Sequence, residues 1–252
     1  MHAKSFFWYE LMTTDMKAAE AFYAAVIGWT PQSFDPGGGM PYTVINAGDR
    51  GVGGIMPLPQ ADLPPAWVGY VYTPDIDAAC ESLEKAGGKV HRPPTGIPTV
   101  GRFAVVSDPQ GAMFMLLAPQ GPEQPPVDRT APGQVGWHEL YTTDWRAARD
   151  FYSGQFGWTA EGEFDMGAMG TYALFGFEPG TQGGGMMNKP DQMPTPAWQF
   201  YFNVEGVDAA AARVTAHGGT VLMGPMEVPG GSWVVQCQDP QGAHFALLSA
   251  AR

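Results

Sequence analysis

The feature of this chain that most constrains its fold is an internal repeat. Residues 8–15 read WYELMTTD and return as WHELYTTD over residues 137–144, an offset of 129 positions. Farther along each half, the segment DPQGA at residues 108–112 returns at residues 239–243, an offset of 131 positions. Self-similarity that extends over half of a chain indicates two copies of one domain.

The two copies meet in a proline-rich segment. Residues 119–126 read PQGPEQPP, a polar stretch that continues neither a strand nor a helix and is typical of a semi-rigid linker. We therefore predict three parts: a first domain over 1–120, a linker over 121–133 and a second domain over 134–252.

Each copy divides again into two similar modules. In the first copy, Asp15 is a favourable N-cap for a helix that runs to about Val26 and ends at Gly28, and three short β-type runs follow. A second strand begins at Ala66, a second helix begins near Asp75, and three strand-like runs again follow. The order βαβββ therefore occurs four times along the chain, which predicts an α+β fold.

These residues resemble the vicinal oxygen chelate superfamily, which contains glyoxalase I, bleomycin-resistance proteins and extradiol dioxygenases. The resemblance rests on the opening strand before Asp15, on Phe22-Tyr23 followed by Gly28-Trp29, and on the DPQG turn before the last strand. It covers nearly the whole chain, once per half, in the manner of a two-domain bacterial glyoxalase-like branch. It implies a tandem duplication whose four βαβββ modules form two cup-shaped curved sheets, with the active site on the cup floors.

The resemblance also implies where a divalent metal would bind, because metal-using members place His, Glu or Gln on four strands of each cup. The matching residues are Trp8, about Met56, Val68 and Met115 in the first cup, and Trp137, about Met187, Gln199 and Ala246 in the second. Only Gln199 could coordinate a cation, and one amide oxygen does not make a site. We therefore predict no metal site and no cofactor, and the ligands of an extradiol dioxygenase are missing.

Two glutamates are the candidate acid–base groups. Because side chains alternate across a strand, Glu10 shares a face with Trp8, and Glu139 shares a face with Trp137. We expect a carboxyl beside an indole in an apolar cup to have a raised pKa and to be able to act as a general acid or base. The competing interpretation is that neighbouring groups bind each glutamate and that its role is structural.

The second cup is the one that we predict to be active. His244 lies on the face of the last strand that points to the same floor as Glu139 and Gln199, whereas the matching places beside Glu10 hold apolar residues. We therefore predict Glu139 and His244 as the catalytic pair. The predicted ligand-binding residues of the two cups are Trp8, Glu10, Met115, Trp137, Tyr141, Gln199 and Tyr201.

Charge and composition limit the partners. The net charge is −12 and the 13 Lys and Arg residues are scattered, which argues against binding to nucleic acids or anionic membranes. No apolar run is long enough for a membrane span or a signal peptide. We therefore predict a cytoplasmic monomer or homodimer that binds a small molecule, with Cys80 and Cys237 as reduced, buried thiols.

Two classes of function remain open. Apolar cup floors favour a module that binds a small hydrophobic or aromatic molecule, as in the drug-sequestering members of the family, which serve in detoxification and bleomycin resistance. The alternative is a glyoxalase-like lyase or isomerase that uses either a divalent metal in a different coordination or Glu139 with His244 as acid and base. We favour the binding site without a metal.

Overall fold

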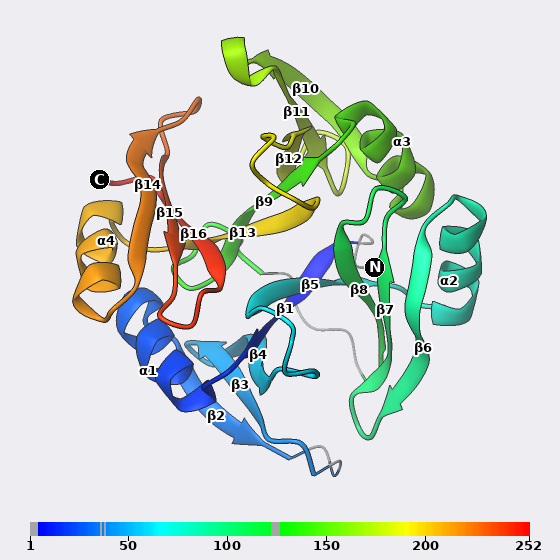
Figure 1. Cartoon of the computed structure of the whole chain (residues 1–252), viewed down its shortest axis with the longest axis horizontal. Helices are drawn as coiled ribbons and strands as arrows, with labels where there is room; N and C mark the ends of the chain where they lie inside the picture. Colours follow the sequence, from blue (N-terminus) through cyan, green and yellow to red (C-terminus); the bar gives the residue numbers. More distant parts are fainter. Residues whose placement is uncertain (1–4, 36, 38, 122–126) are drawn as a thin grey trace.

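The computed structural model describes residues 5–35, 37, 39–121 and 127–252, so part of the predicted linker, 122–126, lies outside the described residues. Within the described residues the chain forms two curved eight-stranded sheets and four α-helices (Figure 1). The predicted α+β fold with a tandem duplication is thus confirmed.

The order of elements is the same in both halves. The first half contains β1 (Phe6–Thr13), α1 (Met16–Ile27), β2 (Thr30–Phe34), β3 (Tyr42–Ala47), β4 (Arg50–Pro57), β5 (Ala66–Tyr72), α2 (Ile76–Lys85), β6 (Lys89–Ile97), β7 (Gly101–Ser107) and β8 (Met113–Pro119). The second half contains β9 (Val135–Thr142), α3 (Trp145–Phe156), β10 (Thr159–Asp165), the 3-10 helix η1 (Gly167–Met169), β11 (Thr171–Gly176), β12 (Gly184–Asn188), β13 (Ala197–Asn203), α4 (Val207–Ala216), β14 (Thr220–Glu227), β15 (Trp233–Gln238) and β16 (His244–Ser249).

The ends of the first helix in each half follow from two residues of the repeat. The Asp15 side chain accepts a hydrogen bond from the Ala18 N–H at the start of α1, and Asp144 caps α3 in the same way. Gly28 ends α1 with a φ of 92°, a left-handed conformation that glycine adopts without a steric penalty. The predicted start and end of the first helix are therefore confirmed.

Strand β6 is longer than its sequence pattern indicates. The β-type run ends near Arg92, but the strand continues through Pro93 and Pro94 to Ile97, with shifts of register on both sides of Arg92. It is the edge strand of its sheet. A proline on an edge strand can direct its missing N–H away from the neighbouring strand, so pairing with β7 survives.

Both sheets have the same strand order, which places the first strands of the two modules together in the middle. The first sheet runs β2-β3-β4-β1-β5-β8-β7-β6, and the second runs β10-β11-β12-β9-β13-β16-β15-β14. In the first sheet β1 pairs with β5 antiparallel, and β5 pairs with β8 in parallel. Strands β1, β5 and β8 therefore lie next to one another at the centre of the sheet.

The sheet faces opposite the cups meet in one shared hydrophobic core. The Phe6 ring on β1 stacks on the His138 ring on β9 at a centroid distance of 5.1 Å, and Tyr9 packs edge-on against Phe200 at 5.1 Å. The helices also cross between halves, since α1 lies beside α4 and α2 lies beside α3 (Figure 1). One face of each sheet is thus covered by the other half of the chain.

Two reciprocal buried hydrogen bonds join the halves. The Tyr23 hydroxyl on α1 donates to Asp239 Oδ2 at 3.0 Å, and the Tyr152 hydroxyl on α3 donates to Asp108 Oδ2 at 3.2 Å. Both aspartates belong to the repeated DPQGA segments, and both tyrosines belong to the repeated Phe-Tyr pairs. The motifs that define the repeat are therefore bonded to each other across the interface between the halves.

Tyr9 and His138 form a further buried pair between equivalent positions, 129 residues apart. The Nδ1–H group of His138 donates to the Gly183 carbonyl at 2.8 Å, which leaves Nε2 to accept from the Tyr9 hydroxyl at 2.6 Å. Burial lowers the pKa of His138 to about 3, so the ring is neutral at physiological pH. The structure places His138 on the core face of β9, away from the cup floor.

Two further features of the described chain are the apolar character of its helices and the state of its two cysteines. Not one of the described helices has the length and apolar character needed to cross a membrane. Cys80 on α2 and Cys237 on β15 are buried free thiols, as predicted. Burial raises the pKa of Cys237 to about 12, so this thiol does not form a nucleophilic thiolate near neutral pH.

The reciprocal tyrosine bonds generate a prediction about stability. The Tyr23 hydroxyl also accepts from the Trp67 indole N–H at 2.9 Å, so Tyr23→Phe leaves two buried polar groups without a partner. We expect this variant to lower the free energy of unfolding by about 1–3 kcal/mol, measured by urea denaturation. Tyr152→Phe should give a similar loss, because its hydroxyl accepts from Trp198 in the same way. Unchanged stability in both variants would contradict this account of the interface.

Candidate functional site

A row of side chains crosses five strands on the floor of each cup. The residues face one another directly in the strand pairing, so they share one face of the sheet. We define the first floor row as Trp8 (β1), Tyr70 (β5), Met115 (β8), Val105 (β7) and Arg92 (β6). The second floor row is Trp137 (β9), Tyr201 (β13), Ala246 (β16), Gln236 (β15) and Met223 (β14).

The first floor row lines a cavity of about 1700 Å³. All five residues of the row contribute to its wall, together with Glu10, Tyr42, Phe103 and other mostly apolar side chains. Phe177, Glu178, Thr181 and Gln182 of the second half contribute as well, and the basic residues on the wall are Arg50, Arg92 and Arg129. The cavity thus offers a large, mainly apolar space with one carboxyl group on its floor.

Glu10 is the buried carboxyl of the first cup, with 5% of its surface exposed. The Tyr70 hydroxyl donates to Glu10 Oε1 at 2.8 Å, and the Tyr42 hydroxyl also hydrogen-bonds to this carboxyl. Tyr42 in turn accepts from the Trp8 indole N–H at 3.0 Å. Burial raises the pKa of Glu10 to about 7, against the opposing effect of the two tyrosines, so both protonation states are populated at neutral pH.

A glycine on β4 makes this arrangement possible. Gly54 pairs directly with Glu10, and a Cβ atom at Gly54 would overlap the Tyr42 hydroxyl. The Tyr42 ring therefore crosses β4 and reaches the carboxyl from β3, two strands away. Gly185 has the same relation to Tyr172 in the second cup, so both cups use a glycine to admit a tyrosine to the floor.

Glu139, the equivalent carboxyl of the second cup, has more hydrogen-bond partners. It is 6% exposed and accepts from the Tyr201 hydroxyl at 2.6 Å. Tyr141 and Tyr172 also hydrogen-bond to it, and Gln236 donates to the Tyr141 hydroxyl at 3.0 Å. Three phenols therefore surround this carboxyl, whereas two surround Glu10.

The structure brings most of the predicted second-cup residues together. Gln199 lies directly opposite Glu139 in the pairing of β13 with β9. The predicted residues that gather on this floor are Trp137, Glu139, Tyr141, Gln199 and Tyr201. In the first cup, the predicted residues Trp8, Glu10 and Met115 all line the cavity.

The predicted pair of Glu139 and His244 is not assembled. His244 is exposed, and its Nε2 atom lies 3.3 Å from the side-chain nitrogen of Gln238. Over the described part of the chain, no hydrogen bond or ion pair joins His244 to Glu139. The physical reason is that tyrosine hydroxyls already occupy the carboxyl, while His244 begins β16 at the open rim of the sheet.

Tyr70 was not predicted from the sequence, and Tyr42 was considered only as a strand aromatic that could line a cup. The strand positions matching Gln199 and His244 hold Val68 and Met113, but Tyr70 and Tyr42 supply the polar contacts instead. Two features of the repeat could have identified these tyrosines from the sequence. Tyr70 is the repeat equivalent of the predicted Tyr201 at an offset of 131, and Tyr42 and Tyr172 recur at an offset of 130. That intermediate offset arises because β10 contains a one-residue bulge near Gly162.

The family's metal-binding positions hold side chains that do not fit a divalent cation. Val68, Met115 and Ala246 are buried and apolar, and the two tryptophans offer only an N–H donor. In the portions of the chain that the structure describes, there is no cluster of three or more His, Cys, Asp or Glu suited to a metal ion. These positions therefore do not supply the three or four ligands that a divalent metal site needs.

Comparison with known proteins identifies the family. The model of the glyoxalase/bleomycin resistance protein/dioxygenase superfamily matches residues 5–116 and 134–247. CFP32 of Mycobacterium tuberculosis, a protein named as a glyoxylase, is 32% identical over 97% of this chain and 94% of its own length. The anthracycline biosynthesis protein DnrV of Streptomyces peucetius is 32% identical over 96% of this chain and 91% of its own length.

Solved structures agree on the fold. A Mn(II)-bound glyoxalase from Novosphingobium aromaticivorans has a TM-score of 0.69 at 17% identity, covering 99% of this chain and 83% of that one. The 2,3-dioxygenase LapB from Pseudomonas sp. KL28 has a TM-score of 0.68 at 14% identity, covering 97% of this chain and 91% of that one. The chain therefore belongs to the glyoxalase/bleomycin resistance protein/dioxygenase superfamily, with one family domain in each half.

Proposed function

We propose that the first cup binds a planar, mainly apolar organic molecule whose polar group meets Glu10. The observation that carries this proposal is the cavity of about 1700 Å³ with a single buried carboxyl on its floor. Ligand sites of drug-sized molecules are typically apolar cavities of roughly 300–1,000 Å³ with a few polar groups that fix orientation. The cavity is large enough for a molecule of several fused rings.

The hydrogen-bond count favours the first cup over the second. A carboxyl group offers about four lone-pair positions. Glu139 receives three phenols, whereas Glu10 receives two because Met12 occupies the place of Tyr141. Glu10 therefore has capacity for a ligand, and its protonated form can also donate. This revises our expectation from the sequence that Glu139 in the second cup is the functional glutamate.

The relatives' names support an aromatic ligand. Two proteins that are 31–32% identical to this chain are named as anthracycline biosynthesis proteins. Anthracyclines are fused-ring quinones that are flat and largely apolar and carry carbonyl and phenol groups. A ligand of this chemical class fits a cavity walled by Trp8, Tyr70 and Phe103.

A second candidate function is acid–base catalysis by Glu10 on the bound molecule. The specific observation in its favour is a pKa of about 7, which is suited to a group that both takes up and releases a proton at neutral pH. A carboxylate could take a proton from a carbon beside a ligand carbonyl and return it at another position, which is an isomerisation. Tyr70 and Tyr42 would hold the carboxyl in place through both steps.

The binding proposal predicts different effects for the two glutamates. Anthraquinone-2-carboxamide, a neutral planar probe, should quench the tryptophan fluorescence of the wild-type protein on binding. Glu10→Met keeps the side-chain volume and removes both oxygens, so we expect it to weaken probe binding roughly tenfold, about 1.4 kcal/mol. Glu139→Met is the matched control and should change the dissociation constant by less than about twofold.

The outcome separates the two cups. A larger effect of Glu139→Met than of Glu10→Met would place the site in the second cup, as the sequence alone suggested. Absence of saturable binding to the wild-type protein would overturn the proposed function. Circular dichroism and thermal melting of each variant establish that weaker binding does not come from unfolding.

The protonation state of Glu10 can be tested through stability. Its pKa rises from 4.5 to about 7 on folding, so between these values the folded state holds more protons than the unfolded state. The free energy of unfolding of the wild type should therefore fall, relative to Glu10→Gln, as the pH rises from 4.5 to 7. The two pKa values correspond to about 3 kcal/mol. Parallel pH profiles of the two proteins in urea denaturation would disprove the raised pKa.

The side chains at the family's metal-binding positions on the two floors predict how much metal the purified protein contains. Because Gln199 is the only potential ligand among the family's ligand positions, and the others hold tryptophan, valine, methionine and alanine, we expect far less than one Mn, Fe, Ni or Zn per chain in untagged protein. Elemental analysis after exhaustive dialysis measures this directly. One tightly held metal ion per domain, lost on Gln199→Ala or on changes at the equivalent strands, would restore a metal-dependent reaction.

A further inference from the structure

The first cup contains a cationic group that the second cup lacks. Arg92 ends the first floor row on β6, and its guanidinium carbon lies 4.9 Å from the centroid of the Phe103 ring. The equivalent positions in the second half are Met223 and Val234, which pair with their neighbours in the same register. The second half therefore lacks this cation and its aromatic platform at the equivalent positions. The wall of the first cavity also carries Arg50 and Arg129, and Arg129 lies 4.5 Å from the centroid of the Phe177 ring, away from the floor row.

Arg92 faces the cavity, although its side chain remains solvent-exposed. Its side chain lines the cavity wall. Burial raises the pKa of Tyr70, the phenol that donates to Glu10, well above its usual value, and the charge of Arg92 opposes this shift, so that charge acts at the floor. Where the structure describes the chain, no carboxylate forms an ion pair with Arg92.

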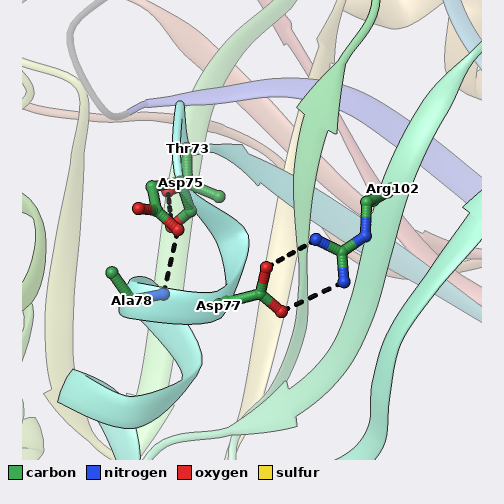
Figure 2. Close-up of polar contacts among 5 residues, drawn as sticks. All are labelled: Thr73, Asp75, Asp77, Ala78 and Arg102. Atoms are coloured by element: carbon green, nitrogen blue, oxygen red, sulfur yellow. Dashed lines mark hydrogen bonds and ion pairs between the residues drawn. The ribbon is translucent and has the colours of Figure 1, made fainter.

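The neighbouring arginine has a different environment. Arg102 precedes Phe103 on β7 and binds Asp77 of α2 through both terminal nitrogens, at 2.5 and 3.0 Å (Figure 2). Asp77 lies on the helix side of the sheet, opposite the cup. Arg102 thus has its anion within the protein, whereas Arg92 in the cavity does not.

Resting on the proposed function, we propose that Arg92 makes the first cup selective for aromatic molecules that carry an anionic oxygen, either a carboxylate or an ionised phenol. A guanidinium that packs on an aromatic ring uses its face for that contact and keeps its N–H edge for an oxygen anion. The chain as a whole has a net charge of −12 and repels anions, so selection for one needs a local cation.

The two polar groups of the cup lie toward opposite ends of the first floor row. Trp8, which is linked to Glu10 through Tyr42, occupies one end, and Arg92 occupies the other. Four strand spacings separate the ends, about 19 Å along the curved sheet. A flat molecule of several rings can therefore place a carbonyl or hydroxyl at Glu10 and an anionic oxygen at Arg92.

The experiment compares two probes of the same shape. Anthraquinone-2-carboxylate differs from anthraquinone-2-carboxamide by its charge, and both can be titrated into the protein at constant ionic strength. We expect the wild type to bind the carboxylate roughly tenfold more tightly, and Arg92→Gln to remove this preference by weakening carboxylate binding alone. Arg92→Lys keeps the charge without the planar fork and should retain part of the preference.

Arg102→Gln is the matched control, since it removes one positive charge from the adjacent strand outside the cavity. Equal affinity of the wild type for the two probes, or an equal loss in Arg92→Gln and Arg102→Gln, would overturn the inference about Arg92. Binding of the neutral probe in those cases would leave the proposed function standing. Failure of both probes to bind would instead defeat the proposed function itself.

The source of the anionic oxygen can be distinguished in the same assay. A hydroxyanthraquinone is titrated at a pH below and a pH above its own ionisation, with Arg92→Gln measured in parallel. Tighter binding above the ionisation in the wild type, but not in Arg92→Gln, indicates that an ionised phenol is accepted as well as a carboxylate. Preference for the carboxylate probe alone restricts the class to aromatic carboxylates.

Discussion

A buried phenol from each half of the chain is hydrogen-bonded to a buried carboxylate of the other half, and the packing of both sheets depends on this exchange. Asp239 accepts from Tyr23 and also from the backbone N–H groups of Gln241 and Ala243, both at 2.9 Å, which shape the turn before β16. One carboxylate therefore organises the turn and holds a helix of the other half. Asp108 does the same in the first half. These contacts commit one face of each sheet to the shared core and leave the other face for the cup.

Because one face of each sheet forms the shared core and the other forms a cup, the side chains of the two halves differ mainly on the cup faces. Most core-facing positions have to fit the opposing half, so their side chains keep similar volumes and hydrogen-bonding partners. Cup-facing positions on the floors line a cavity and are less constrained by the opposing half. The replacements of Met12 by Tyr141, Val105 by Gln236 and Arg92 by Met223 all lie on the floors. The same fold thus carries one apolar cavity with a titrating carboxyl and one cup whose carboxyl is enclosed by phenols.

The sequence predicted the fold better than the contacts of the site. The repeat, the capping Asp15 and the terminating Gly28 are local signals, so they identified the modules and the helix ends. Strand alternation also placed Trp8 and Glu10 on the cup face. Alternation predicts on which face of the sheet a side chain lies, but not how far that side chain extends across neighbouring strands. It therefore could not show that Tyr42 crosses Gly54 from two strands away.

The separation of His244 from Glu139 has the same origin. Its position on β16 is on the expected strand, yet a hydrogen bond to Glu139 requires a free lone pair and a short path between side chains. Three tyrosines occupy that carboxyl, and His244 lies at the rim beside Gln238. The continuation of β6 through Pro93 and Pro94 could not be predicted from the sequence either, because prolines normally end a strand and the sequence does not show that β6 lies at the edge of its sheet.

The contact between Tyr9 and His138 has a consequence for the origin of the molecule's asymmetry. In a dimer of identical single domains, a residue on the twofold axis meets its own copy, so the contact must join like with like. Two tyrosines or two neutral histidines there could hydrogen-bond in either direction, because each side chain is both a donor and an acceptor. Joining the copies in one chain lets one position become a donor and the other an acceptor, with the histidine proton fixed by Gly183. Covalent fusion thus permits a directional hydrogen bond at the centre of an otherwise symmetric protein.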